Sequence, residues 1–199
     1  MFTKRSALAA AIAASALVLT ACSDDGKSMA AHEGMTAGAS PTSAPASSAV
    51  FNDADVMFAQ MMIPHHEQAV EMADLAATRA ADPEVKELAE KIKEAQDPEI
   101  ATMESWLREW GKPVPTGGMG HDMPGIMSEG DMKKLEAAKG TEFDKQFVTM
   151  MIAHHEGAID MARTEEAKGV NPEAKALAKT IVTTQQAEID QMEQILARF

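Results

Sequence analysis

Cysteine, tyrosine and basic residues are scarce in this chain of 199 residues. It has one cysteine, no tyrosine, and 18 basic against 31 acidic residues, for a net charge of -13. A single cysteine excludes an intrachain disulfide and a thiolate cluster. The acidic balance argues against nucleic acid as a partner, because binding it requires a basic surface. The chain also lacks a nucleophile elbow, a phosphate loop and a dinucleotide fingerprint, so no enzyme class is indicated.

The N-terminus has the features of a secretory signal. Two basic residues precede an apolar run from Ala7 to Leu19, which is too short for a spanning helix of about 20 residues. The following LTAC sequence looks like a bacterial lipobox, in which Cys22 becomes the lipidated N-terminus; the alternative is an ordinary signal with a chance cysteine. We therefore predict a signal peptide over residues 1–21 and an extracytoplasmic protein attached to the membrane through Cys22.

Residues 22–49 are rich in alanine, serine, glycine and proline and show no apolar periodicity. Such a segment cannot bury enough surface to offset the entropy lost on ordering. We predict a flexible tether there. The remaining residues, 50–199, are close to the usual size of one domain.

Two thirteen-residue stretches of this domain are nearly the same. MMIPHHEQAVEMA begins at Met61 and MMIAHHEGAIDMA begins at Met150, so the offset is 89 residues. The same offset relates Pro83 to Pro172 and Met103 to Met192 without a gap. The pattern favours duplication of one supersecondary unit, with repeats at about 53–110 and 142–199 joined by a linker over 111–141.

Each unit is expected to be a helical hairpin. Phe58, Met62, His65, Ala69 and Met72 recur at spacings of 3 and 4, which makes one helical stripe. Asp-Pro at 82–83 and Asn-Pro at 171–172 are start signals for the second helices. No segment shows convincing strand alternation. We predict an all-α, antiparallel four-helix bundle, with a short extra helix over 128–138 that begins with a capping-box-like pattern.

The repeated motif supplies candidate metal ligands. Its methionines and histidines are four residues apart, so their side chains are neighbours on the helix surface. These candidates are Met61, Met62, His65, His66, Met150, Met151, His154 and His155. We expect His65 and His154 to point nearest the bundle axis and His66 and His155 to lie toward its edge. Glu67 and Glu156 are expected on the opposite side.

The hairpin geometry adds residues from the second helices. Counted from the turn, His65 is level with Gln96 and Glu99, and Met61 is level with Met103. A buried carboxylate needs a partner. An imidazole N–H of His65 would provide it, with Glu99 as an orienting group or as a second ligand. The candidate ligands therefore also include Glu99, Met103 and their counterparts Glu188 and Met192, which are level with His154 and Met150.

Methionine accompanies histidine outside the helices too. His32 lies between Met29 and Met35, and His121 lies between Met119 and Met123. Packing cannot explain such pairs in a tether or a glycine-rich loop, so Met119, His121 and Met123 are further candidate ligands. Thioethers favour Cu(I), while imidazole suits copper, zinc, iron or nickel. Copper, as Cu(I), Cu(II) or both, is the leading prediction, and zinc or another divalent metal stays open.

A di-iron enzyme is the first rival for a four-helix bundle, but it needs Glu-x-x-His on two helices. Met62 and Met151 stand where those glutamates would be. The prediction is therefore an envelope copper scavenger, buffer or metallochaperone rather than an enzyme. The alternatives are an envelope interaction module without metal and a redox-active copper enzyme. The sequence leaves open whether the chain forms a homo-oligomer and which partner receives the metal.

The doubled motif and the segment HDMPGIMSEGDMKKLEAAKGTEFDKQF resemble the bacterial domain-of-unknown-function 305 family over about residues 50–199. The resemblance implies a ferritin-like four-helix bundle and, for some members, extracytoplasmic copper binding and resistance. By position, the family motif falls on Met61, Met62, His65, His66 and Glu67, and again on Met150, Met151, His154, His155 and Glu156. Pro64 departs from Ala153 of the second copy. A proline removes a helical hydrogen bond, so we expect a kink in the first copy.

Overall fold

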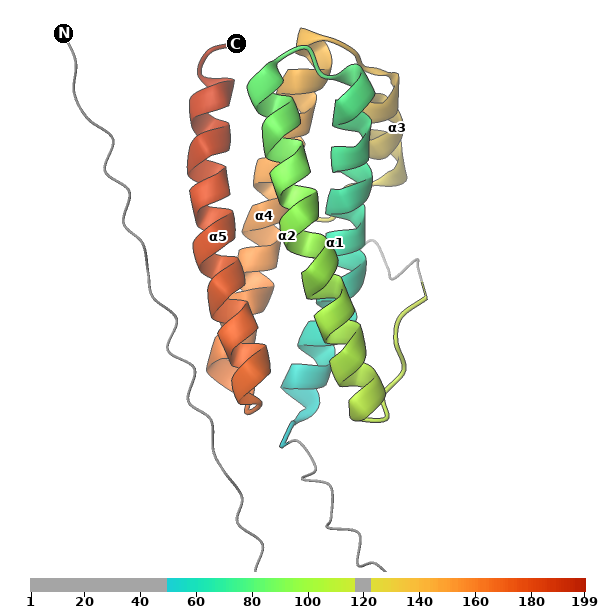
Figure 1. Cartoon of the computed structure of the whole chain (residues 1–199), viewed down its shortest axis with the longest axis vertical. Coiled ribbons are helices and arrows are strands. Elements are labelled where there is room, and N and C mark those ends of the chain that lie inside the picture. The colour runs from blue at the N-terminus through green and yellow to red at the C-terminus, as the bar shows by residue number, and fades with distance from the viewer. Residues whose placement is uncertain (1–49, 117–122) are drawn as a thin grey trace, which may run out of the picture. The chain divides into compact units, whose positions relative to one another are not determined.

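Four long helices form an antiparallel bundle, and a short fifth helix lies against it (Figure 1). The computed structural model describes residues 50–116 and 123–199. The helices are α1 (Asp53–Arg79), α2 (Pro83–Glu109), α3 (Glu129–Ala137), α4 (Thr141–Lys168) and α5 (Pro172–Leu196). The helices α1 and α2 form one hairpin, α4 and α5 form the other, and α1 packs against α4. The predicted all-α bundle is confirmed.

The helix starts follow the signals in the sequence. Asn52 caps α1 and forms a capping box with Asp55, whose side chain accepts the Asn52 N–H. Asp82 and Asn171 cap α2 and α5, each followed by a proline. Ser128 caps α3 by accepting the Asp131 N–H. Across the two described ranges, no helix is long and apolar enough to span a membrane.

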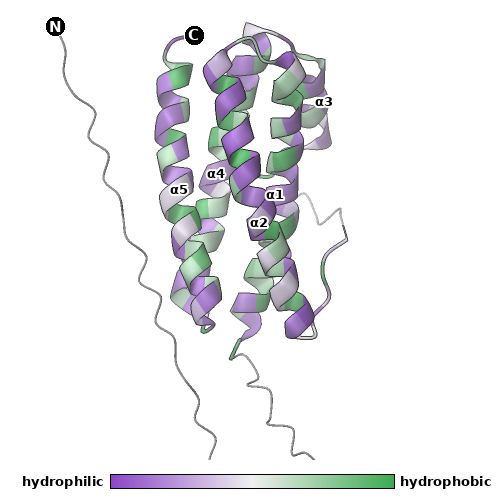
Figure 2. Cartoon of the chain, in the orientation of Figure 1, coloured by the Kyte–Doolittle hydropathy of each residue, from purple (hydrophilic) through white to green (hydrophobic). Residues whose placement is uncertain are grey.

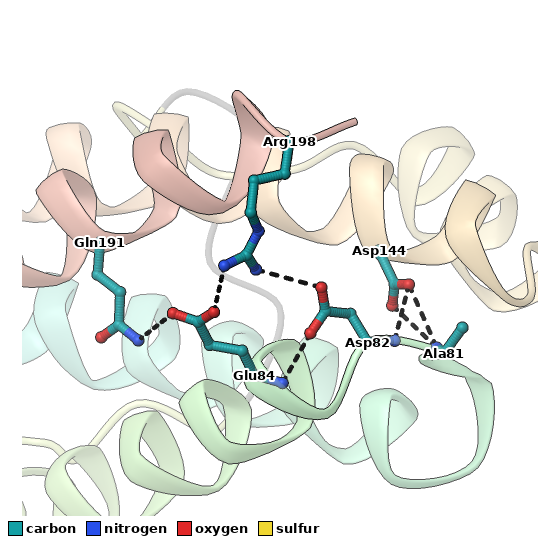
Figure 3. Close-up of polar contacts among 6 residues, drawn as sticks. All are labelled: Ala81, Asp82, Glu84, Asp144, Gln191 and Arg198. Atoms are coloured by element: carbon teal, nitrogen blue, oxygen red, sulfur yellow. Dashed lines mark hydrogen bonds and ion pairs between the residues drawn. The ribbon is translucent and has the colours of Figure 1, made fainter.

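Two buried aspartates, 89 residues apart, fasten the hairpins to each other. Asp144 on α4 accepts hydrogen bonds from the N–H groups of Ala81 (3.1 Å) and Asp82 (3.0 Å) in the α1–α2 turn. Figure 3 shows this contact beside the ion pairs of Arg198. Asp55 on α1 does the same in the α4–α5 turn, where it accepts from Val170 and Asn171. Each turn is thus held by a helix of the other hairpin, which satisfies both buried carboxylates.

The apolar core has two parts along the bundle. One part contains Phe143, Phe147, Leu88 and Ile92, and the other contains Phe58, Ile63, Met103 and Ile181. Hydrophilic residues are distributed over the outer surfaces of the helices (Figure 2). On α1 and α4 the histidines fall between the residues of these two parts. A layer of polar side chains, the histidines, therefore lies between the two parts of the core.

The proline in the first copy does not interrupt its helix. The helix α1 is continuous from Asp53 to Arg79, and Pro64 is buried within it. The helix α2 likewise continues through Pro98. The kink expected at Pro64 stays a prediction, and the two copies also differ in what surrounds their histidines.

Candidate metal centre

His65 of α1 and His154 of α4 meet at the centre of the bundle. Their ring centroids are 3.8 Å apart with an angle of 43° between the planes. Both side chains are buried, at 0% and 1% exposure. The His65 Nε2–H donates to the Pro124 carbonyl oxygen at 3.1 Å, which leaves a lone pair on Nδ1. Within the described residues, His65 Nδ1 and both ring nitrogens of His154 have no hydrogen-bond partner.

Burial keeps this pair of imidazoles neutral. It lowers the pKa of His65 to about 3, with a further contribution from the neighbouring His66. Burial, followed by the closeness of His65, holds the pKa of His154 well below its ordinary value. Neutral imidazole is the form that binds metal ions, because one ring nitrogen then offers its lone pair. The two buried imidazoles thus each offer a nitrogen lone pair that a metal ion could accept.

The second histidine of each motif binds the carboxylate of the neighbouring helix. His66 Nε2 lies 2.8 Å from Glu99 Oε2, and His155 Nε2 lies 2.7 Å from Glu188 Oε2. The expected pairing of Glu99 with His65 is therefore wrong, as is its counterpart between Glu188 and His154. One residue along a helix turns the side chain by about 100°. His66 consequently faces α2, whereas His65 faces α4.

The expectation that His66 and His155 lie toward the edge of the bundle is also wrong. Both are 0% exposed, because α2 and α5 cover them. The exposed fractions of their carboxylate partners, Glu99 and Glu188, are 15% and 19%. A histidine that donates one N–H to a carboxylate presents its other nitrogen in a fixed direction. That nitrogen, Nδ1, has no partner among the described residues in either histidine.

A segment of the central connection closes over the histidine pair. A Cβ placed on Gly157 of α4 would lie 2.1 Å from the Pro124 carbonyl oxygen, so the connection touches α4 where only glycine fits. Gly125, at φ +77°, lies against the same turn of α4, next to the carbonyl oxygens of Ala153 and His154. On α1, the Gln68 side chain bonds the N–H and the carbonyl of Met127, at 2.7 and 2.9 Å. Gly157 and Gln68 are 89 residues apart, so the two helices hold this segment from corresponding positions.

The sequence alone gives no reason to expect Pro124 as a histidine partner. The available signal is a difference between the two motif copies: glycine at 157 stands where the first copy has Gln68. A glycine inside a helix costs about 1 kcal/mol relative to alanine. Its presence therefore suggests that another part of the backbone comes close, which is what the structure has at this point.

The predicted methionines fall into two groups. Those fully buried are Met62, Met103, Met151 and Met192, whereas Met61, Met123 and Met150 are half-buried. Glu67 and Glu156 are exposed, on the side away from the histidines. Met119, His121 and Cys22 lie outside the described residues.

Carboxylates and imidazoles alone do not make a metal site here. Between residues 50–116 and 123–199 there is no group of three or more His, Cys, Asp or Glu side chains that could hold a metal ion. The ring nitrogens without partners belong to His65, His66, His154 and His155. Methionines lie about one turn before them on the same helices, so imidazole and thioether side chains are neighbours there.

These features define a class of protein: a four-helix bundle of two mutually fastened hairpins with a buried histidine and methionine level at its centre. The chain belongs to the DUF305 family, described as "Domain of unknown function (DUF305)", whose profile matches residues 55–196. A comparison with curated proteins finds no match.

Several solved structures are similar to this chain over the whole bundle. A DUF305 fragment from Deinococcus radiodurans has 33% identity and a TM-score of 0.69, covering 74% of this chain and 98% of that one. A DUF305 protein from Streptomyces coelicolor, described as a candidate secreted protein, has 34% identity and a TM-score of 0.68, covering 73% and 93%. CopM in its Cu(II)-bound form has 36% identity and a TM-score of 0.65, covering 72% and 96%.

Proposed function

We propose that this protein binds copper outside the cytoplasm and sequesters the ion or passes it on, without acting as an enzyme. The observation that carries the proposal is the pair of His65 and His154. These two neutral imidazoles have three ring nitrogens without hydrogen-bond partners in the described structure. An unpaired buried nitrogen costs roughly 1–3 kcal/mol, and a bound metal ion would remove that cost.

The surrounding residues fit this cargo. Met61 and Met62 on α1, and Met150 and Met151 on α4, lie about one turn before the histidines and would add thioether donors. Glu99 and Glu188 would orient His66 and His155 so that their free Nδ1 atoms are available. The similarity to CopM, a structure of which contains Cu(I), supports copper as the ion. Zinc is less suited, because it favours cysteine or a tetrahedral set of histidine and carboxylate ligands.

Attachment to the outer face of a membrane is the second part of the proposal. It rests on the sequence of residues 1–49, where the signal and LTAC precede a segment too polar to fold alone. The lipid on Cys22 would anchor the protein, and the tether would let the bundle move near the membrane surface. The Met-His clusters around His32 and His121 would add weaker sites for capture.

Competition titration with Cu(I) tests the metal site. The purified protein and its variant with both His65→Ala and His154→Ala are titrated against a Cu(I) chelator, and circular dichroism checks that the variant folds. Removing both rings should weaken the tightest site by on the order of 100-fold or more. Met132→Leu, which changes a buried methionine of α3, is the matched control. Unchanged affinity and stoichiometry in the histidine variant would show that the pair is structural.

Thermal unfolding separates this proposal from a metal-free interaction module. A ligand that binds only the folded state raises the melting temperature, by an amount that grows with its concentration. Cu(I) should therefore raise the melting temperature of the wild type and have a smaller effect on the histidine variant. A melting temperature that copper leaves unchanged would favour the interaction module.

A further inference from the structure

A methionine-lined pocket opens beside the histidine pair. Its volume is about 440 Å³, and it lies between the first half of α1 and the last part of α4. Met57, Met61 and Met161 line it, together with Glu165 and Pro124. Pro124 is the residue whose carbonyl binds His65. Pro124 therefore contacts both the pocket and His65.

At the other end of the same helix pair the corresponding pocket is smaller, about 260 Å³, and Lys134, Lys145, Gln146 and Met150 are among its lining residues. There α3 packs against the last half of α1 and the first half of α4, on the right of the bundle in Figure 1. Met132 and Leu135 of α3 are buried in that contact, within the same core part as Met72 and Phe143. Met72 stands 89 residues before Met161, yet it is fully buried whereas Met161 is only half-buried. Met72 is thus part of the apolar core, whereas its equivalent Met161 lines the larger pocket.

Differences in sequence account for the open space. Phe143, which fills the covered end, corresponds to Ala54 in the pocket, and Leu75 corresponds to Thr164. Both changes replace a large apolar side chain with a smaller one. The smaller side chains at these two positions therefore help to form the pocket. The absence of a covering helix is not its only cause.

Two further differences change which side chains line the pocket. Met57 stands where the second copy has Gln146, and its side chain is 60% exposed. Methionine packing cannot explain a residue that is mostly in solvent. Glu165 stands where the first copy has Ala76, and it is 1% exposed. No N–H or O–H group of the described residues donates to the Glu165 carboxyl.

We propose that this pocket is an outer capture site for a soft monovalent metal ion, Cu(I) or its analogue Ag(I), held by the thioethers of Met57, Met61 and Met161. This inference rests on the proposed function, because the ion would pass from the pocket to His65 and His154. Thioethers select Cu(I), and the acidic residues at the pocket concentrate cations. Asp53 and Asp160 line it, against a single basic residue, Lys168.

Met61 connects the two sites. It lines the pocket and lies four residues before His65, so its side chain is next to that histidine on the surface of α1. The transfer is a ligand exchange in which a thioether leaves as an imidazole nitrogen binds. The oxidation state of the ion does not change and no proton has to move, because the imidazoles are already neutral. An ion needs a path to the histidines, since both are almost completely buried.

Methionine methyl NMR with Ag(I) tests the capture site. The full protein, labelled with ¹³C at its methionine methyl groups, is titrated with Ag(I), both as wild type and with His65→Ala and His154→Ala. Single Met57→Leu and Met161→Leu changes assign the two signals. These signals should shift in both proteins, whereas the Met132 signal from α3 should stay in place. Signals of Met57 and Met161 that do not move in either protein would overturn the inference.

The same titration keeps the two proposals apart. Imidazole signals that shift while the Met57 and Met161 methyl signals stay in place would overturn the capture site and leave the histidine site intact. Methyl shifts without imidazole shifts would instead overturn the histidine site and the transfer to it.

The rate of Cu(I) uptake from a chelator tests the transfer. Met57→Leu with Met161→Leu conserves the apolar volume and should slow uptake about 10-fold, the lower end of what local concentration contributes to association rates. Met132→Leu, measured in parallel, should not change the rate. Equal uptake rates in all three proteins would show that ions reach the histidines by another path.

Discussion

Replacing Gly157 with alanine tests the closure of the central connection over the histidine pair. The new Cβ would lie 2.1 Å from the Pro124 carbonyl oxygen and 2.7 Å from the Gly125 nitrogen. Real Cβ contacts are almost never shorter than 3.0 Å. Because both contacts are to backbone atoms, no side-chain rotation relieves them. The connection therefore has to move away from α4 until the 2.1 Å contact lengthens to at least 3.0 Å.

Two effects of opposite sign decide the outcome. Alanine in a helix interior is favoured over glycine by about 1 kcal/mol. Against this, overpacking costs about 1–3 kcal/mol, and His65 Nε2–H loses its acceptor at Pro124, which costs roughly another 1 kcal/mol. The net result is a free energy of unfolding that is lower by about 1–3 kcal/mol. For a bundle of this size the melting temperature should fall by about 3–9 °C.

Thermal and urea unfolding, followed by circular dichroism at neutral pH, measure this change. Gly130→Ala in α3 is the matched control, because its Cβ would meet only the Ser128 hydroxyl oxygen at 3.6 Å. That variant should be neutral or more stable by up to about 1 kcal/mol. If Gly157→Ala also stabilised the protein, the connection would not be seated on α4, and the arrangement of Pro124 at His65 would be wrong.

Three further predictions concern the buried polar groups. Glu99→Ala and Glu188→Ala each remove the acceptor of a buried imidazole and should lower the free energy of unfolding in urea by about 1–3 kcal/mol; no loss in either would contradict the pairing. Burial, followed by the neighbouring Asp55, raises the pKa of Glu165 from 4.5 to about 8. Between these two pKa values the folded state holds a proton that the unfolded state has released. Glu165 therefore makes the free energy of unfolding fall as the pH rises from 4.5 to about 8. Glu165→Gln should remove this contribution to the pH dependence of stability. Asp144→Ala should destabilise by about 1–3 kcal/mol because it leaves two turn N–H groups unpaired, whereas Arg198→Ala, at an exposed ion pair (Figure 3), should have little effect.

The fold was predictable because its determinants are local. The helix expected over 128–138 is observed as Glu129–Ala137, and the second helices of the hairpins begin at Pro83 and Pro172, where the start signals were expected. Apolar residues three and four apart define each helix, and capping residues with prolines define where it begins. Short turns then leave few arrangements other than antiparallel neighbours.

The pairing of histidines with carboxylates could not be predicted in the same way. Counting from the turn correctly placed Glu99 near the level of the motif, since its partner is only one residue from the expected one. The count gives height along the hairpin and says nothing about rotation around the helix. The helix α1 packs against both α2 and α4, so two adjacent histidines can both be buried while facing different helices.

Contacts made by the central connection also need the structure. Nothing in the local sequence says that Pro124 returns to the helices over a distance of 59 residues to reach His65. Helical periodicity describes the helices that carry the histidines and not the irregular segment that covers them. The difference between Gly157 and Gln68 marks the place, but it does not identify the partner.

This covering segment makes the two central histidines unequal although their motifs are nearly the same. The carbonyl of Pro124 fixes the proton of His65 on Nε2, so Nδ1 is the nitrogen that keeps a lone pair. His154 has no partner on either nitrogen within the described residues, so no such contact fixes its tautomer. A pair with one ring held and the other ring free can change its coordination as an ion arrives or leaves, at little cost in broken hydrogen bonds. For the copper site proposed above, this inequality favours uptake and release of the ion over permanent binding, for which both rings would be held by second hydrogen bonds.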